Sequence, residues 1–73
     1  MTYKFTIIVP VYNEEDNLVR VETELSNYIK TASVTTSILF VNDGSTDNSQ
    51  QMIEAICNRN EAFGFINFKE NRG

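Results

Sequence analysis

Three short apolar segments alternate with two segments of helical period along this chain, and this alternation constrains the fold more than any other feature. The apolar segments, 5–9, 37–41 and 63–68, are rich in β-branched or aromatic residues, which favour strands. Between them, residues 17–32 and 47–57 carry apolar side chains at three- and four-residue steps, as amphipathic helices do. This order predicts an α/β fold, a three-stranded parallel βαβαβ sheet.

Local signals predict where these elements begin and end. Pro10 has no N–H group to donate to a neighbouring strand, so we expect the first strand to end there. Asn13 is suited to cap the first helix, with Asp16 returning a hydrogen bond. In the same way, Asp47 is suited to cap the second helix, with Gln50 three residues later.

Each helix is expected to face the sheet with one apolar stripe. The stripe residues are Leu18, Val21, Leu25, Tyr28, Ile29 and Ala32 on the first helix, and Met52, Ile53, Ile56 and Cys57 on the second. Right-handed crossovers place both helices on one face of the sheet if the strands lie in chain order. The other face then has no cover, which favours half of a doubly wound sheet over a natural three-stranded domain with one wet face.

An uncovered sheet face has a consequence for association. Exposed apolar side chains and an unpaired strand edge both promote contacts between copies of a chain. We therefore expect self-association through the uncovered face or through the free edge of the first strand.

Composition excludes several classes of partner and site. The 73 residues carry a net charge of −4, and the six Lys and Arg residues are scattered, which argues against nucleic acid as a main partner. One Cys and no His exclude a disulfide framework and most zinc sites, and fit a reducing cytoplasm. No apolar run approaches the ~20 residues of a membrane span, so none is expected.

Polar residues follow the first two strands, where α/β sheets bind ligands. Pro10, Tyr12 and Glu14 come after the first strand, and Asp43 comes after the second. Adjacent strands lie about 4.8 Å apart, so these two loops should be neighbours. Tyr12 offers a ring that can pack on a heteroaromatic base, and Asp43 offers a carboxylate that can accept hydrogen bonds from a base or a ribose.

The same residues have simpler interpretations. Asp43 and Gly44 alone are also typical of a plain turn, and Glu14 of a charge that favours a helix N-terminus. The chain has no glycine-rich phosphate loop after the first strand, so a dinucleotide site or a P-loop is poorly supported. The residues themselves indicate a ligand site at a strand-end corner and no closer identity.

Three ordered segments carry a further resemblance. They are Thr6-Ile7-Ile8-Val9-Pro10-Val11-Tyr12-Asn13-Glu14-Glu15, Ile38-Leu39-Phe40-Val41-Asn42-Asp43-Gly44-Ser45-Thr46-Asp47, and Asn71-Arg72-Gly73. Together they resemble the opening of family-two glycosyltransferases, which have the Rossmann-like GT-A fold. The resemblance covers residues 1–73 and implies that they form the N-terminal, nucleotide-sugar-binding half of such a domain.

The resemblance also implies an activity. Members move a sugar from a nucleotide-activated donor, usually UDP- or GDP-linked, to an acceptor hydroxyl, typically with inversion. Pro10, Tyr12 and Glu14 match the loop that lines the nucleoside pocket, and Asp43 matches the acid that contacts the base. Gly44 and Ser45 match the turn that shapes the second loop.

Asn42 departs from the commoner Asp-Asp-Gly-Ser form of the second motif, which puts a secondary contact in doubt. The family's metal-binding Asp-x-Asp motif, its catalytic base and its acceptor site follow later strands. We therefore expect a divalent metal, Mg or Mn, for the full-length enzyme, and assign no catalytic residue and no metal ligand within this chain. The expected location is the cytoplasm, or the inner face of the membrane.

The alternative is a free-standing α/β binding or interaction module without catalysis. The reading frame beyond Gly73 distinguishes the two hypotheses. A downstream Asp-x-Asp motif favours the enzyme, and a stop codon favours the module.

Overall fold

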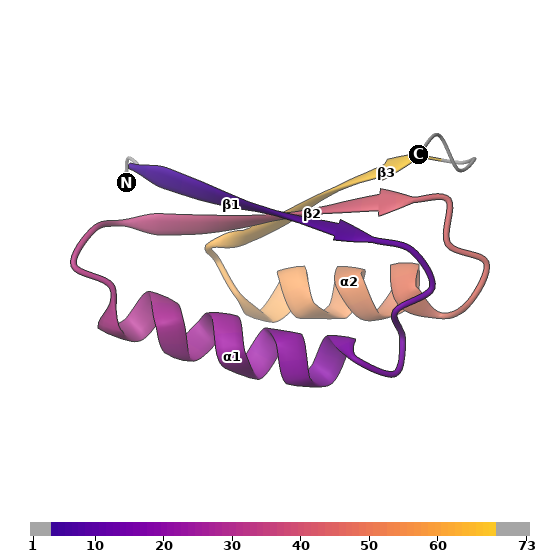
Figure 1. Cartoon of the computed structure of the whole chain (residues 1–73), viewed down its shortest axis with the longest axis horizontal. Coiled ribbons are helices and arrows are strands. Elements are labelled where there is room, and N and C mark those ends of the chain that lie inside the picture. Colours follow the sequence, from indigo (N-terminus) through magenta and orange to yellow (C-terminus); the bar gives the residue numbers. More distant parts are fainter. Residues whose placement is uncertain (1–3, 69–73) are drawn as a thin grey trace.

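Residues 4–68 are described by a computed structural model, which shows a single sheet with two helices (Figure 1). In chain order the elements are β1 (Phe5–Val11), α1 (Leu18–Thr31), β2 (Thr36–Asp43), α2 (Ser49–Arg59) and β3 (Phe63–Phe68). The strands are parallel and lie in the order β1-β2-β3. Both helices lie on the same side of the sheet (Figure 1). The predicted βαβαβ fold is therefore confirmed.

The core lies between this side of the sheet and the two helices. Along the central strand β2, alternate residues are buried, with Ile38 and Phe40 at its middle. Phe40 is completely buried and its ring lies 5.9 Å from that of Phe63. Ile53 and Ile56 of α2 complete this core with Leu18 of α1. The period of two in β2 and the helical period in α2 thus converge on one apolar layer.

The predicted helix stripes are confirmed except at Ala32, which follows the end of α1, and at Tyr28. Val21, Leu25 and Ile29 of α1 pack against the core, as do Met52 and Cys57 beside the buried residues of α2. Tyr28 is 52% exposed, so its assignment to the stripe was wrong. It lies at the flank of the stripe, where its phenol oxygen can remain in water.

Two strands extend further than predicted. Pro10 lies inside β1 beside Val41 of β2, so the prediction that it ends the strand was wrong. β1 is at the edge of the described sheet, where a missing N–H group is tolerated. Likewise, Asn42 and Asp43 are the last residues of β2 rather than turn residues. The turn itself begins at Gly44, whose φ of 73° suits glycine.

The predicted helix caps were also wrong in part. α1 begins after Asn17, and neither Asn13 nor Asp16 caps it. α2 begins after Asn48, and Asp47 contributes from one position earlier, because its Oδ1 accepts the N–H of Ser49 at 2.9 Å. These segments contain several Asn, Asp and Ser residues in succession, and each is a suitable cap by type alone.

The second face of the sheet is not covered by the described residues. Ile8, Ile66 and Phe68 are 55%, 46% and 38% exposed. In the register of the strands they alternate with the residues that face the helices. One predicted feature, an apolar sheet face without cover from this part of the chain, is thus present.

We propose that, in the 73-residue chain by itself, a second copy covers this face. Replacing Ile66 by lysine is expected to shift the 73-residue chain toward monomer, because it places a charge among the exposed apolar side chains. Val19→Lys is the control, since Val19 is 63% exposed on α1. Sedimentation velocity at micromolar concentration measures the change. A wild-type chain that is monomeric there contradicts the proposal.

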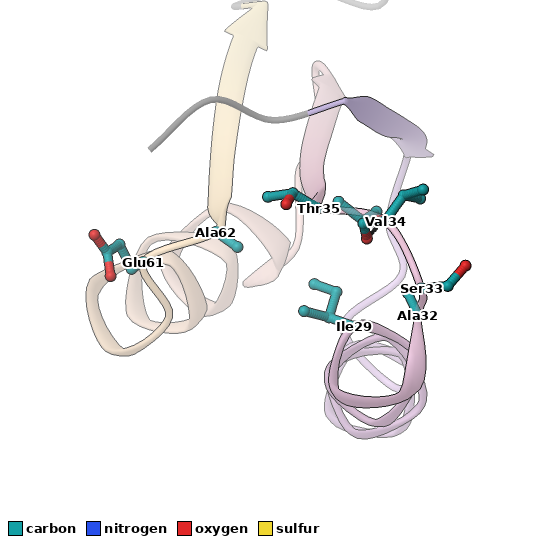
Figure 2. Close-up of a pocket in the computed structure, with 8 residues that line it drawn as sticks. Ile29, Ala32, Ser33, Val34, Thr35, Glu61 and Ala62 are labelled. Carbon is teal, nitrogen blue, oxygen red and sulfur yellow. Dashed lines mark hydrogen bonds between the residues drawn. The ribbon is translucent and has the colours of Figure 1, made fainter.

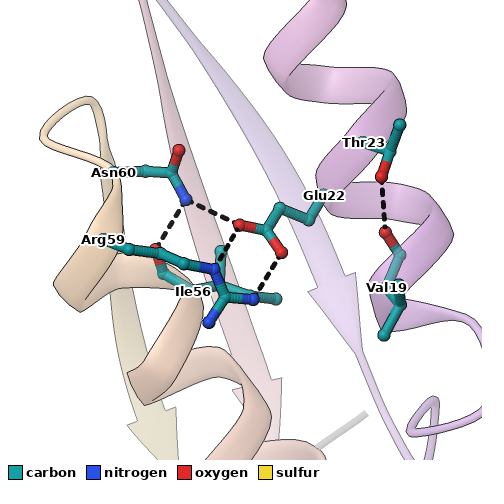
Figure 3. Close-up of polar contacts among 6 residues, drawn as sticks. All are labelled: Val19, Glu22, Thr23, Ile56, Arg59 and Asn60. Atoms are coloured by element: carbon teal, nitrogen blue, oxygen red, sulfur yellow. Dashed lines mark hydrogen bonds and ion pairs between the residues drawn. The ribbon is translucent and has the colours of Figure 1, made fainter.

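An ion pair joins the two helices near the end of α2 (Figure 3). Arg59 donates from Nε and Nη2 to the two carboxylate oxygens of Glu22, at 2.8 and 2.6 Å. Asn60 donates to Glu22 at 2.8 Å and to the carbonyl of Ile56 at 2.8 Å. The hydrogen bonds from Arg59 lower the pKa of Glu22 below 4.5, with Asn60 acting in the same direction and burial opposing it.

This lowered pKa predicts a contribution to acid sensitivity. Glu22 stabilises the fold fully above its unfolded-state pKa, and this contribution is lost as pH falls below about 4.5 through the folded-state pKa. Glu22→Gln is expected to lower the free energy of unfolding at pH 7 and to flatten its pH dependence in the acid range. Glu24→Gln, an exposed acid on the same helix, is the control. Denaturant unfolding from pH 7 to pH 3 measures both, and equal slopes for the two variants contradict the assignment.

Candidate functional site

The two loops that follow β1 and β2 lie together at the carboxyl ends of the strands (Figure 1). Val11, the last residue of β1, pairs with Asn42 of β2. Tyr12 and Asp43 are the next residues after this pair, so they lie at the same edge of the sheet, where Asp43 still pairs with Phe68 of β3. We call these two loops, residues 12–17 and 44–48, the strand-end corner.

Asn13 joins the two loops of the strand-end corner. Its backbone is in the left-handed region, with a φ of 53°, which asparagine tolerates better than most residues. Its side-chain Oδ1 accepts the N–H groups of Thr46 at 2.8 Å and Asp47 at 3.3 Å. Its own N–H donates to Oγ of Ser45 at 3.0 Å. One residue of the first loop therefore holds three consecutive residues of the second.

The N-terminal ends of the two helices are joined next to this contact. The N–H of Glu14 donates to the buried Oγ of Ser49 at 2.9 Å, and the N–H of Glu15 donates to Oδ2 of Asp47 at 3.3 Å. Burial alone would raise the pKa of Asp47, but hydrogen bonds from Ser49 and the N–H of Glu15 outweigh it, and the pKa is lowered. Asp47 thus acts as an ionised acceptor that holds the two loops.

Asn42 supports the turn of the second loop from inside the fold. It is 1% exposed, and its Oδ1 accepts hydrogen bonds from both the N–H and the Oγ of Ser45. Its Nδ2 donates to Oε1 of Gln50 at 2.7 Å. The position that departs from the commoner motif is therefore a buried support of the turn.

The four predicted site residues occupy different positions at the corner. Pro10 is the second-last residue of β1 and is exposed. Tyr12 follows that strand directly and is 47% exposed. Asp43 is half-buried at the end of β2, beside Phe68 of β3. Glu14 is half-buried, and its Oε2 accepts a hydrogen bond from Asn17 at 2.9 Å. The structure brings the strand ends that carry Tyr12 and Asp43 to one edge, while the side chain of Glu14 is bonded within its own loop and its backbone to Ser49.

Sequence reasoning missed the residues that hold the corner together. Asn13 was predicted as a helix cap, and Ser49 was not singled out at all. The available signal was the residue type, because asparagine both accepts a positive φ and offers a side-chain acceptor. The partners of Asn13 lie more than thirty residues away, which no local pattern indicates.

Other features lie away from this corner or are not seen in the described residues. A shallow depression opens at the opposite end of the sheet, and its lining includes Ile29, Val34, Glu61 and Ala62 (Figure 2). Within residues 4–68, no group of three or more acidic or cysteine side chains could hold a metal ion. In that same part of the chain no helix is long and apolar enough to cross a membrane. The motif Asn71-Arg72-Gly73 lies outside the described residues.

Comparison with known proteins identifies the family. A family model described as Glycosyl transferase family 2 matches residues 6–73, which is nearly the whole chain. The chain belongs to glycosyl transferase family 2. Family membership confirms the resemblance that the ordered motifs indicated, and it agrees with the parallel βαβαβ arrangement.

Two relatives of this chain are much longer than the chain itself. It is 33% identical over 73 residues to a protein of Synechocystis sp. (strain ATCC 27184 / PCC 6803 / Kazusa) named as an uncharacterized glycosyltransferase. It is 37% identical over 68 residues to the poly-beta-1,6-N-acetyl-D-glucosamine synthase of Staphylococcus aureus (strain MSSA476). All of this chain aligns with the first and 93% with the second, but it spans only 23% and 16% of their lengths.

Proposed function

We propose that this chain is the N-terminal, nucleoside-binding part of a larger glycosyltransferase. The enzyme would transfer a sugar from a UDP- or GDP-activated donor to an acceptor hydroxyl, with inversion at the anomeric carbon. Family membership supports sugar transfer, and the small share of each relative that the chain spans supports the role of a part.

The observation that carries the proposal is the position of Tyr12 and Asp43 on two strand ends whose loops are hydrogen-bonded to each other. An exposed phenol ring provides a face on which a flat base can stack. A carboxylate accepts hydrogen bonds from a base N–H or a ribose hydroxyl. Two such groups at one edge of a sheet can recognise the nucleoside end of a donor.

Pro10 and Glu14 have supporting roles in this proposal. Pro10 restricts the backbone of the strand end that leads to Tyr12. Glu14 holds the shape of the first loop, because its N–H is bonded to Ser49 and its carboxylate to Asn17. Both residues would define the wall of a nucleoside pocket without contacting the base through a charged group.

The diphosphate of the donor would be bound by other groups. The first loop carries Glu14, Glu15 and Asp16, whose charges repel a phosphate. We propose that the full-length enzyme uses a divalent metal, Mg or Mn, to neutralise the leaving diphosphate. The acidic side chains described here do not converge on a metal position, so we assign them no part in that step.

We also propose that the enzyme works in the cytoplasm or at the inner face of the membrane. Cys57, the one cysteine of the chain, is free, which fits a reducing compartment. Burial raises the pKa of its thiol, so it is expected to behave as an unreactive core residue.

Substitutions at the corner test the proposal in the longer protein. Tyr12→Ala and Asp43→Asn are each expected to weaken binding of UDP or GDP by about tenfold, the value of one stacked base or one charge-assisted hydrogen bond. Isothermal titration calorimetry with UDP and with GDP measures the effect and indicates which base is preferred.

Two controls separate recognition from general effects on surface and charge. Tyr28→Ala removes a tyrosine that is similarly exposed but lies on α1. Asp16→Asn removes one negative charge from the exposed turn before α1. Both controls should bind nucleotide like the wild type. Unchanged affinity in both corner variants would remove the site assignment, and a wild-type protein that binds neither UDP nor GDP would contradict the proposed function.

A further inference from the structure

A chain of hydrogen-bonded side chains runs from the first loop of the corner to the surface of α2. The N–H of Asn13 donates to Ser45, whose Oγ bonds to Oδ1 of Asn42. Nδ2 of Asn42 donates to Oε1 of Gln50 at 2.7 Å, and Nε2 of Gln50 donates to Oε2 of Glu54 at 2.8 Å. We call the three side chains joined by the last two hydrogen bonds, the amides of Asn42 and Gln50 and the carboxylate of Glu54, the amide relay.

The two ends of the amide relay determine its direction. The backbone N–H of Ser45 can only donate, so Asn42 must turn its oxygen toward it. The carboxylate of Glu54 accepts hydrogen bonds, so Gln50 must turn its nitrogen toward it. The remaining contact then joins a nitrogen of Asn42 to an oxygen of Gln50, which is the observed arrangement.

This direction requires an amide at position 42. An aspartate there could still accept from Ser45, but it has no hydrogen to donate to Oε1 of Gln50. If Gln50 turned its amide to satisfy the aspartate, its own oxygen would face the carboxylate of Glu54. Position 42 is buried, so with Gln50 unturned the aspartate lacks a donor where water does not reach. With Gln50 turned, its oxygen faces another acceptor, the exposed carboxylate of Glu54.

We propose that Asn42 is a positioning residue of the nucleoside corner, and that Glu54, acting through Gln50, determines that this residue is asparagine. Asn42 holds the turn that follows Asp43, so it fixes the position from which the carboxylate of Asp43 would contact a nucleoside. This last step rests on the proposed function. The relay itself rests on contacts within the described residues.

The relay makes a specific prediction about two substitutions made together. With glutamine at position 54, the whole chain can reverse, because that side chain can donate to Gln50, which can then donate to an aspartate at 42. Asn42→Asp should therefore destabilise the chain when Glu54 is present and much less when Glu54→Gln is also present. The expected coupling is about tenfold in the unfolding equilibrium constant, the value of one hydrogen bond to a charged group.

Controls distinguish the relay from simple repulsion between two acids. Gln50→Met removes both donors and acceptors at the middle of the relay while keeping a long helix-forming side chain. In that background the coupling between positions 42 and 54 should disappear if the relay carries it, and should persist if the charges act through space. Glu24→Gln removes an exposed acid from α1 and should not rescue Asn42→Asp.

Denaturant unfolding of the 73-residue chain measures the coupling between positions 42 and 54. Hydrogen exchange of the Asn42 side-chain amide, compared between the wild type and Gln50→Met, measures the contact of Asn42 with Gln50 without altering position 42. The proposal is overturned if the unfolding equilibrium constants show a coupling factor near one, or the same factor in the Gln50→Met background. It is also overturned if the side-chain amide of Asn42 exchanges as fast as that of free asparagine. If Asn42→Asp folds only with Glu54→Gln, the proposal is supported. If neither variant folds, the side-chain exchange decides.

The functional step is measured separately in the longer protein. Affinity for UDP and GDP should fall in Asn42→Asp and return in the double variant with Glu54→Gln. Rescue of stability without rescue of affinity would overturn the positioning role. If the wild type binds neither nucleotide, the proposed function fails, while the coupling measured in the 73-residue chain still decides the relay.

Discussion

The hydrogen bonds between Asn13 and the second loop are the interactions on which the strand-end corner depends. β1 and β2 bring the two loops to the same edge, but neighbouring loops can still move independently. The side chain of Asn13 restricts this relative motion of the loops, because it accepts hydrogen bonds from the backbone N–H groups of Thr46 and Asp47. Because its oxygen satisfies two N–H groups near the start of α2, the corner and the helix are stabilised by the same atom.

A second layer of polar contacts supports this one from inside the fold. Ser49 and Asn42 are both buried, and each presents its side chain to a loop backbone. Buried polar groups are costly unless they are bonded, and in the described residues every such side-chain atom has a partner. A ligand site built on these contacts can keep Tyr12 and Asp43 at its surface while the residues beneath them stay fixed.

The sequence was sufficient for the architecture and insufficient for the contacts of the site. The period of two in β2 and the stripes of α1 and α2 depend on nearest neighbours and on burial, so they could be read along the chain. The ordered motifs around Tyr12 and Asp43 were likewise sufficient for the family. Asn13 could not be assigned in this way, because its cap-like residue type is used for partners more than thirty residues away. Pro10 was misjudged because its tolerance depends on the place of β1 at the edge of the described sheet.

The Asn13 side chain fixes the second loop, and amide hydrogen exchange of Thr46 and Asp47 tests this role most directly. Asn13→Gly is the appropriate variant, because glycine accepts the positive φ and removes only the side chain. Both amides should be protected in the wild-type chain and should exchange about tenfold faster in Asn13→Gly, as expected for a lost hydrogen bond. Wild-type amides at these positions that exchange as fast as those of an unfolded peptide would contradict this role.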